Sequence, residues 1–298
     1  YRERIALGHY LSKIVLDRIE KDLKNTIFSY IPNTAEVAFY GLIKGMEEYL
    51  NAIKVERILS WGKDVDAEKL NEMVNRKIRQ EKIAIKDVKL RTFITEDANR
   101  NEMVQHVYDI TYGTVRKNED SLVVIDDSIV RGTTLKESIV RMLSRLSPKK
   151  IIVVSSAPQI RYPDCYGIDM SKMGDFIAFK AAIALLKERG MEQIMNDVYQ
   201  KIKALEAKNE LHTQNVVREL YQPFTTEEIS DKIAQLITPD NIQIPVEVIY
   251  QTIEGLHACC PTNTGDWYFT GNYPTPGGNK VCNKAYTNYI EGNDQRGY

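Results

Sequence analysis

The sequence predicts an α/β protein in which helices flank a parallel β-sheet, because buried-strand patterns alternate with amphipathic helical patterns. Residues 122–125 and 151–154 are unbroken runs of Leu, Val and Ile, as expected for strands covered on both faces of a parallel sheet. Between them, Leu135, Ile139 and Met142 recur at helical spacing. Two such strands joined by a helix form a βαβ unit, the repeating element of parallel sheets.

The N-terminal part continues this pattern. Apolar residues at helical spacing predict a first helix over about residues 7–23, and a short strand follows at 27–31. A second helix is expected to begin after Pro32, with Asn33 and Glu36 at the spacing of a capping box. Its first turn offers free backbone N–H groups to an anion.

The remaining chain is predicted to be mostly helical. Residues 51–85 are interpreted as a polar helical surface insertion. Helices are expected over about 176–186, 191–205 and 226–237, and the tail after residue 250 holds 7 of the 16 glycines and is predicted to be irregular. We therefore expect a core domain over residues 1–170 and a helical extension with an irregular tail over residues 171–298.

The most informative segment is Ile125-Asp-Asp-Ser-Ile-Val-Arg-Gly-Thr-Thr134, in which a buried strand ends in two carboxylates. A loop and a helix follow, and Thr134 and Glu137 have capping-box spacing. Ligands of α/β sheets bind beyond the carboxyl ends of the strands, where helix N-termini attract phosphate. Asp126 and Asp127 are expected to accept hydrogen bonds from ligand hydroxyls and to hold a hard divalent cation. The segment therefore predicts a site for a ribose 5-phosphate.

This segment resembles the phosphoribosyl pyrophosphate (PRPP) motif of type I phosphoribosyltransferases, most closely that of the glutamine PRPP amidotransferase family. Residues Ser156 to Met170 resemble the next strand and loop of the same family. The resemblance implies the type I phosphoribosyltransferase fold and transfer of the phosphoribosyl group from PRPP to ammonia, giving 5-phosphoribosylamine and pyrophosphate. This is the first committed step of purine synthesis. It also implies a cytoplasmic homo-oligomer that purine nucleotides inhibit.

The resemblance also implies roles for individual residues. Asp126 and Asp127 would be the catalytic residues that bind the ribose hydroxyls and Mg²⁺. The 5-phosphate would be bound by Ser128, Arg131, Gly132, Thr133 and Thr134. Pyrophosphate would be bound by Asn33, Thr34 and Arg91. Two departures from the family pattern stand out: Ala35 occupies the position of a serine that helps to coordinate magnesium, and the flexible-loop segment around Arg91 lacks the family's glycine.

Cys165, Cys259, Cys260 and Cys282 are expected to be reduced thiols. Some members of the family bind a [4Fe–4S] cluster through four cysteines. Such a cluster is possible here but not favoured, because an adjacent Cys259–Cys260 pair replaces the family's Cys-x-x-Cys and four thiolates must converge.

Composition excludes several classes of partner. A formal net charge of −1 gives no basis for binding nucleic acid or an anionic membrane, and the longest apolar runs are strand-sized. The chain opens at Tyr1 on a helical pattern, so we expect a fragment that lacks the family's N-terminal glutaminase domain and does not hydrolyse glutamine.

Three alternatives stay open. A purine or orotate phosphoribosyltransferase shares the same motif but uses a nucleobase as nucleophile. A regulatory PRPP-binding domain would bind without turnover, although no DNA-binding module is evident. A degenerate amidotransferase domain would bind PRPP and turn it over poorly, as Ala35 and the incomplete flexible loop suggest.

Overall fold

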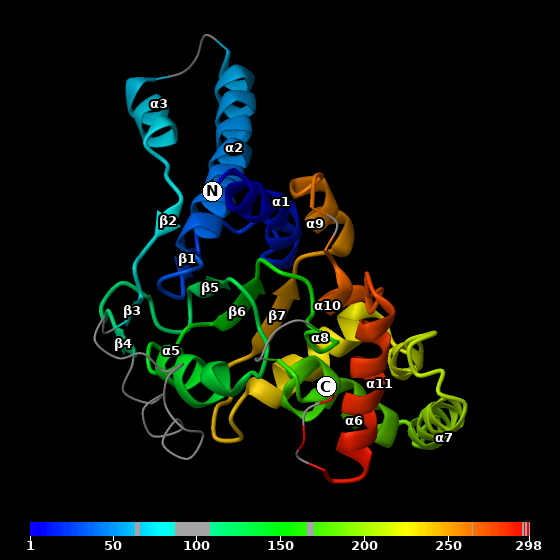
Figure 1. Cartoon of the computed structure of the whole chain (residues 1–298). Coiled ribbons are helices and arrows are strands. Elements are labelled where there is room, and N and C mark those ends of the chain that lie inside the picture. Colours follow the sequence, from blue (N-terminus) through cyan, green and yellow to red (C-terminus); the bar gives the residue numbers. More distant parts are fainter. Residues whose placement is uncertain are drawn as a thin grey trace. The chain divides into compact units, whose positions relative to one another are not determined.

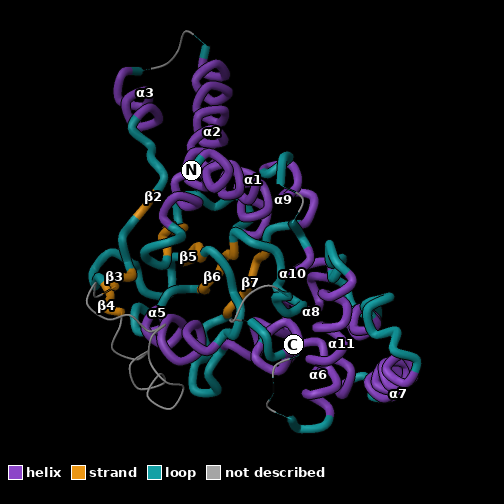
Figure 2. Tube along the Cα trace, viewed as in Figure 1, coloured by secondary structure: helices purple, strands orange, loops and turns teal. Residues whose placement is uncertain are grey.

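The main β-sheet has five strands in the order β2–β1–β5–β6–β7, and each neighbouring pair is parallel (Figures 1 and 2). The strands are β1 (Thr26–Tyr30), β2 (Arg79–Gln80), β5 (Ser121–Asp126), β6 (Lys150–Ser155) and β7 (Val246–Tyr250). Every residue of β1 is buried, as are the first five of β5 and the last five of β6. The predicted α/β class with a parallel sheet is confirmed.

The computed structural model describes residues 1–62, 66–86, 108–165, 170–263, 265–293, 295 and 297. These divide into two compact units. The sheet unit comprises Tyr1–Asp127, Arg141–Ser156 and Ile242–Gln251, and the helical unit comprises Ser128–Val140, Ala157–Asn241 and Thr252–Tyr298. This division differs from the predicted boundary at residue 170, because β7 comes from the predicted extension and pairs with β6.

Helices α1 (Arg2–Arg18) and α2 (Glu36–Trp61) pack on each other and form the apolar core over one face of the sheet. Their backbones approach closely: a Cβ atom added to Gly8 would lie 1.8 Å from the carbonyl oxygen of Ala38, and one added to Gly41 would lie 2.0 Å from that of Ile5. Only glycine permits this approach. The core joins helix residues such as Leu42 to Phe28 and Val123 of the strands.

The prediction of a helical insertion over residues 51–85 was only partly correct. Helix α2 continues to Trp61 and α3 spans Ala67–Val74 beside it (Figure 1), but β2 and β3 (Ala84–Lys86) follow. Strand β3 pairs antiparallel with β4 (Tyr108–Ile110). Ile78 and Ile83 of this segment are buried. The segment therefore packs on the sheet unit, where β2 pairs with β1.

The helical unit matches the predicted helices closely. Its elements are η1 (Leu135–Val140), η2 (Met173–Asp175), α6 (Ile177–Glu188), α7 (Gln193–Ala207), η3 (Val216–Leu220), α8 (Thr226–Ile237), α9 (Ile253–Cys259), α10 (Trp267–Thr270) and α11 (Pro276–Ile290). Thr225 caps α8 in a capping box with Glu228. The prediction of an irregular tail was wrong, because Pro276 begins a 15-residue helix whose Val281, Ala285 and Tyr286 are buried.

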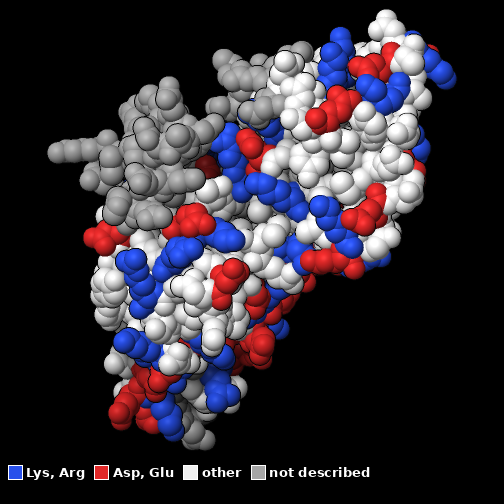
Figure 3. Space-filling view, turned by 90° about the horizontal axis from the view of Figure 1, so that it is seen from below, with Lys and Arg blue, Asp and Glu red and all other residues white. Residues whose placement is uncertain are grey.

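Surface charge is mixed, and basic and acidic side chains are interspersed on the face shown in Figure 3. Among the described helices, none combines the length and the apolar character that crossing a bilayer requires.

A buried carboxylate anchors the N-terminal end of β5. The Asp120 side chain has no exposed surface, and its Oδ2 accepts hydrogen bonds from Nη2 of Arg79 at 2.9 Å and from the backbone N–H of Arg116 at 2.8 Å. Burial would raise the pKa of Asp120, but the hydrogen bonds from Arg79 and Arg116 outweigh it and hold the pKa well below its usual range. The carboxylate is therefore charged and paired at neutral pH.

We expect Asp120→Asn to lower the free energy of unfolding at pH 7 by about 2 kcal/mol, because it removes charge-assisted hydrogen bonds from a buried acceptor. A depressed pKa stabilises the folded state fully above about pH 4 and progressively less as the pH falls toward the folded pKa. The difference from wild type should therefore be smaller at pH 3 than at pH 7. Urea unfolding at both pH values checks this, with exposed Glu72→Gln on α3 as control; equal differences at both would contradict it.

Candidate functional site

The direction in which strands are added to the sheet reverses between β1 and β5. From β1 the chain crosses to β2 on one side, whereas β5, β6 and β7 add successively on the other. Such a reversal is a topological switch point, where open α/β sheets bind ligands beyond the strands' carboxyl ends. Tyr30 and Ile125 are paired at these ends, and the N–H of Ile31 donates to the carbonyl of Ile125 at 2.9 Å. The β1–α2 loop and the Asp126–Asp127 pair therefore start at the same edge of the sheet.

The β1–α2 loop spans residues 31–35 and brings Asn33 and Thr34 to the surface, where both are exposed. The Pro32–Asn33 peptide bond is cis. The predicted capping box between Asn33 and Glu36 was wrong: Ala35 is the N-cap of α2 and no side chain caps the first turn. The first turn of a 26-residue helix thus begins at this loop without a side-chain acceptor from its N-cap residue.

Asp126 and Asp127 stand at the carboxyl end of β5, both half-buried. Burial first, and then repulsion by the adjacent Asp127 carboxylate, raise the pKa of Asp126 well above its usual range, while Lys86 acts in the opposite direction. Ser156, after β6, ties down the backbone here: its N–H donates to the carbonyl of Asp126 at 2.9 Å and its hydroxyl to that of Asp127 at 3.1 Å. Ser156 therefore holds the backbone of the pair at two carbonyl groups.

The rest of the motif belongs to the helical unit. Gly132 has φ of +72°, and a Cβ atom there would lie 3.0 Å from Cγ1 of Ile177, so both conformation and space favour glycine. The N–H of Ile177 donates to the carbonyl of Val130 at 2.8 Å, which fastens the loop to the start of α6. Thr133 and Thr134 are exposed. The loop is thus held by its backbone and presents its hydroxyl-bearing residues to solvent.

The predicted cap of the following helix was wrong. Thr134 lies within the helical segment, which continues as the π-helical turn η1 (Leu135–Val140) and then as α5 (Arg141–Ser144). A residue inside the helix is not its N-cap, so Thr134 and Glu137 do not form the capping box that their spacing predicted.

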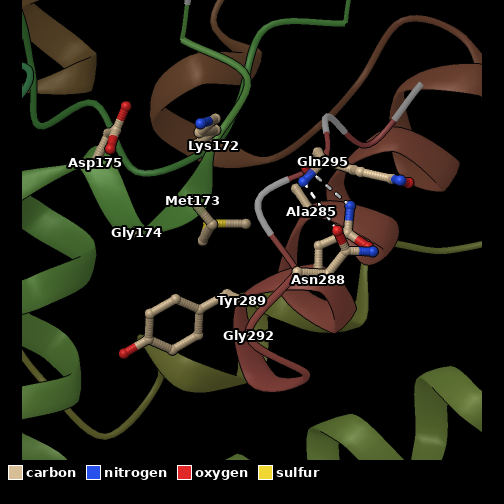
Figure 4. Close-up of a pocket in the computed structure, with 10 residues that line it drawn as sticks. Lys172, Met173, Gly174, Asp175, Ala285, Asn288, Tyr289, Gly292 and Gln295 are labelled. Carbon is tan, nitrogen blue, oxygen red and sulfur yellow. Dashed lines mark hydrogen bonds between the residues drawn. The ribbon is translucent and has the colours of Figure 1, made fainter. Parts of the chain in front are cut away.

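Arg131, predicted to bind the 5-phosphate, lies near Asp175 of η2 with an Nε–Oδ2 distance of 3.5 Å, and both side chains are partly exposed. Such a pair is weak and easily exchanged for another anion. Asp175 also lines a pocket of about 320 Å³ with Lys172, Asn288 and Tyr289 (Figure 4). None of the predicted site residues lines this pocket, so it is not the predicted site, although Asp175 links it to Arg131.

Two further groups were predicted from the sequence. Arg91 falls outside the described residues, and its role stays a prediction. Cys165, Cys259, Cys260 and Cys282 all belong to the helical unit, and burial raises the pKa of Cys282 to about 12. Within the described part of the chain, no three His, Cys, Asp or Glu side chains group as a metal site. Whether the four thiols bind a [4Fe–4S] cluster, which requires four converging thiolates, stays a prediction.

Sequence analysis did not predict the contacts among three residues around the β1–α2 loop. Oε1 of Glu36 accepts hydrogen bonds from the hydroxyls of Tyr30 at 2.9 Å and Tyr40 at 2.8 Å. The spacing of Glu36 and Tyr40, four residues apart at the start of a helix, was a usable signal. The contact with Tyr30 depends on how the loop folds and had no signal of its own.

The sequence is similar to curated amidophosphoribosyltransferases. It is 49% identical over 61 residues to the enzyme of Pasteurella multocida, which is 20% of this chain and 12% of that protein. It is 30% identical over 158 residues to that of Saccharomyces cerevisiae, which is 52% of this chain and 20% of that protein. The matched region thus spans between about a tenth and a fifth of the length of these relatives. No family model matches the chain.

Among solved structures, a glutamine PRPP amidotransferase from B. subtilis complexed with ADP and GMP aligns with a TM-score of 0.49 at 21% identity, covering 92% of this chain and 42% of that one. The curated sequences show the similarity to amidophosphoribosyltransferases. The predicted resemblance is confirmed: over the matched residues this chain is similar to amidophosphoribosyltransferases.

Proposed function

We propose that this chain transfers the phosphoribosyl group of PRPP to ammonia, giving 5-phosphoribosylamine and pyrophosphate. The bond between ribose C1 and the pyrophosphate oxygen breaks, a C1–N bond forms, and the nitrogen loses a proton. The observation that supports this best is the pairing of β1 and β5, which starts the loop with Asn33 and Thr34 and the Asp126–Asp127 pair at one edge of the sheet. The similarity to amidophosphoribosyltransferases supports the same reaction.

Each part of the proposed site has a role that its chemistry suits. Carboxylates of Asp126 and Asp127 accept hydrogen bonds from the ribose hydroxyls and stabilise positive charge on the sugar as the leaving group departs. The loop from Ser128 to Thr134, which follows directly in the chain, holds the 5-phosphate through hydroxyls, backbone N–H groups and Arg131. Asn33 and Thr34, with Arg91, hold pyrophosphate. No covalent intermediate is needed, because positioning and electrostatics supply the rate.

A magnesium ion suits the donor set. Two adjacent, half-buried carboxylates repel each other, and hard oxygen ligands of this kind are those that Mg²⁺ prefers. When bound with PRPP, Mg²⁺ neutralises charge on the pyrophosphate. Since the described residues offer no third acidic, His or Cys side chain in one group with them, the substrate and water would supply the other ligands.

Purine nucleotides are proposed as inhibitors, since a nucleoside monophosphate carries the same ribose 5-phosphate and competes for the same loop. The ammonia of the whole protein is proposed to come from a glutaminase domain outside this sequence. The cytoplasmic location and the homo-oligomeric state remain predictions of the resemblance.

The test of the function is pyrophosphate release from PRPP with Mg²⁺, measured with ammonium chloride, with glutamine and with neither. Release with ammonium chloride alone supports the proposal. Release that depends on an added nucleobase would favour a nucleobase phosphoribosyltransferase, and PRPP binding without release would favour a regulatory or degenerate domain.

We expect the double variant Asp126→Asn, Asp127→Asn to lower ammonia-dependent pyrophosphate release by at least about a hundredfold, the effect of losing well-placed charge contacts in an active site. The fold should survive, because removing mutual repulsion does not destabilise the strand end. Initial rates and circular dichroism check both parts. Exposed Asp17→Asn on α1 is the matched control. Wild-type rates in the double variant would refute the assignment.

We expect Arg131→Ala to weaken the binding of adenosine monophosphate about 10- to 100-fold, because one charge-assisted phosphate contact is lost. Asp175→Asn should act in the opposite sense, tightening binding by up to about fivefold, since it frees Arg131 from a weak pair. Calorimetric titration of both variants measures this, with exposed Arg145→Ala as control. A loss of affinity in both variants would show that the pair itself, rather than free Arg131, supports the loop.

A further inference from the structure

One carboxylate ties together the two ends of the β1–α2 loop. Tyr30 is the last residue of β1 and Glu36 is the first of α2, so the hydrogen bond between them closes the five-residue loop 31–35. The same oxygen of Glu36 accepts a second hydrogen bond from Tyr40, one turn further along α2. Both distances, 2.9 and 2.8 Å, are those of well-formed O–H···O bonds.

The ring of Tyr30 is itself fixed. It is 8% exposed, and its centroid lies 5.0 Å from that of Phe39 on α2. Its pKa is raised to about 12 by burial and by Glu36, whereas hydrogen bonds from Tyr40 and Tyr30 lower the pKa of Glu36. At neutral pH the phenols are therefore donors and the carboxylate is the charged acceptor, so the hydrogen bonds persist.

The position of this carboxylate matters for an anion. A glutamate in the first turn of a helix readily turns toward the backbone N–H groups there, where the helix dipole favours negative charge. Such a turn would occupy the donors that the loop presents beside exposed Asn33 and Thr34, and it would add a repelling charge. Two phenol donors instead satisfy Glu36. The carboxylate of Glu36 is thus engaged by two phenols, and the first turn has no side-chain cap from its N-cap residue Ala35. The N–H of Glu36 donates to the carbonyl of Asn33 at 3.4 Å, which further fixes the loop.

We propose that Tyr30, Glu36 and Tyr40 are positioning residues that hold the β1–α2 loop in the form that binds the pyrophosphate group. This inference rests on the proposed function, because it assigns pyrophosphate to Asn33 and Thr34. The three residues act through the loop and do not touch the substrate.

The test compares two ligands that use different parts of the site. Calorimetry measures binding of magnesium pyrophosphate and of adenosine monophosphate to the 298-residue chain and to Tyr30→Phe with Tyr40→Phe, which keeps both rings. We expect the affinity for pyrophosphate to fall about tenfold, equivalent to losing a hydrogen bond to a charged group. Affinity for adenosine monophosphate should stay unchanged when both proteins are titrated well below their thermal midpoints. The KM for PRPP should rise more than kcat falls.

The control is Tyr10→Phe, a partly exposed tyrosine on α1 that should change neither affinity. Glu36→Gln, which keeps an acceptor oxygen, should retain more pyrophosphate affinity than Glu36→Ala. Equal loss of both ligands would overturn the positioning role in favour of a general structural one, and wild-type affinities in the double variant would also overturn it. If the wild-type chain itself fails to bind magnesium pyrophosphate, the proposed function falls, and this inference with it.

Discussion

The pairing of β1 with β5 is the constraint on which the candidate site depends. Five consecutive residue pairs, from Thr26 with Ser121 to Tyr30 with Ile125, set the two strand ends level. A slip of one residue would turn every side chain of one strand to the opposite face of the sheet. Phe28 of β1 or Val123 of β5, depending on which strand turns, would then leave the core formed with α1 and α2. Hydrophobic burial on this face therefore determines where two polar loops begin.

Asp120 directly precedes strand β5 and Asp126 is its last residue. The pKa values of these two carboxyl groups are shifted in opposite directions. Asp120 is buried but paired with two arginines, and its pKa lies below the usual range. At the other end, burial and the neighbouring Asp127 raise the pKa of Asp126. A carboxylate paired with arginines stabilises the fold, whereas a carboxylate whose pKa is raised by burial and by a neighbouring carboxylate opposes it. Groups of the second kind gather at functional sites.

How far the sequence predicts this structure depends on the length of the pattern. The runs 122–125 and 151–154 predicted β5 and β6 because a buried strand needs only continuous apolar residues. The helix predicted over about residues 226–237 is α8, which begins at Thr226. Strands β2 and β3, with two and three residues, are too short to show a period, and they form by pairing with β1 and β4. The division of the PRPP motif between two units also has no local signal, because it reflects packing.

The same limit applies to the candidate site. Asp126 and Asp127 were predictable because their chemistry lies in one short segment. Ser156 and Asp175, which hold the backbone after β5 and contact Arg131, come from distant segments and were not predicted. Supporting residues of this kind are recognised only when the chain is folded, since their role is defined by what they touch.

Ala35 bears on the alternative that this chain binds PRPP but turns it over poorly. A serine there helps to coordinate magnesium in the family, and its replacement favoured weak turnover. In this structure, however, Ala35 is 1% exposed and packs in the core with Tyr30 and Phe39. A hydroxyl at this position on the present backbone would be buried among apolar side chains, at a cost unless it found a partner. Alanine is thus the residue that this packing favours, and the loop is left with exposed Asn33, Thr34 and backbone N–H groups as its donors. The departure at Ala35 is therefore explained by the core, and it is not by itself evidence of lost function.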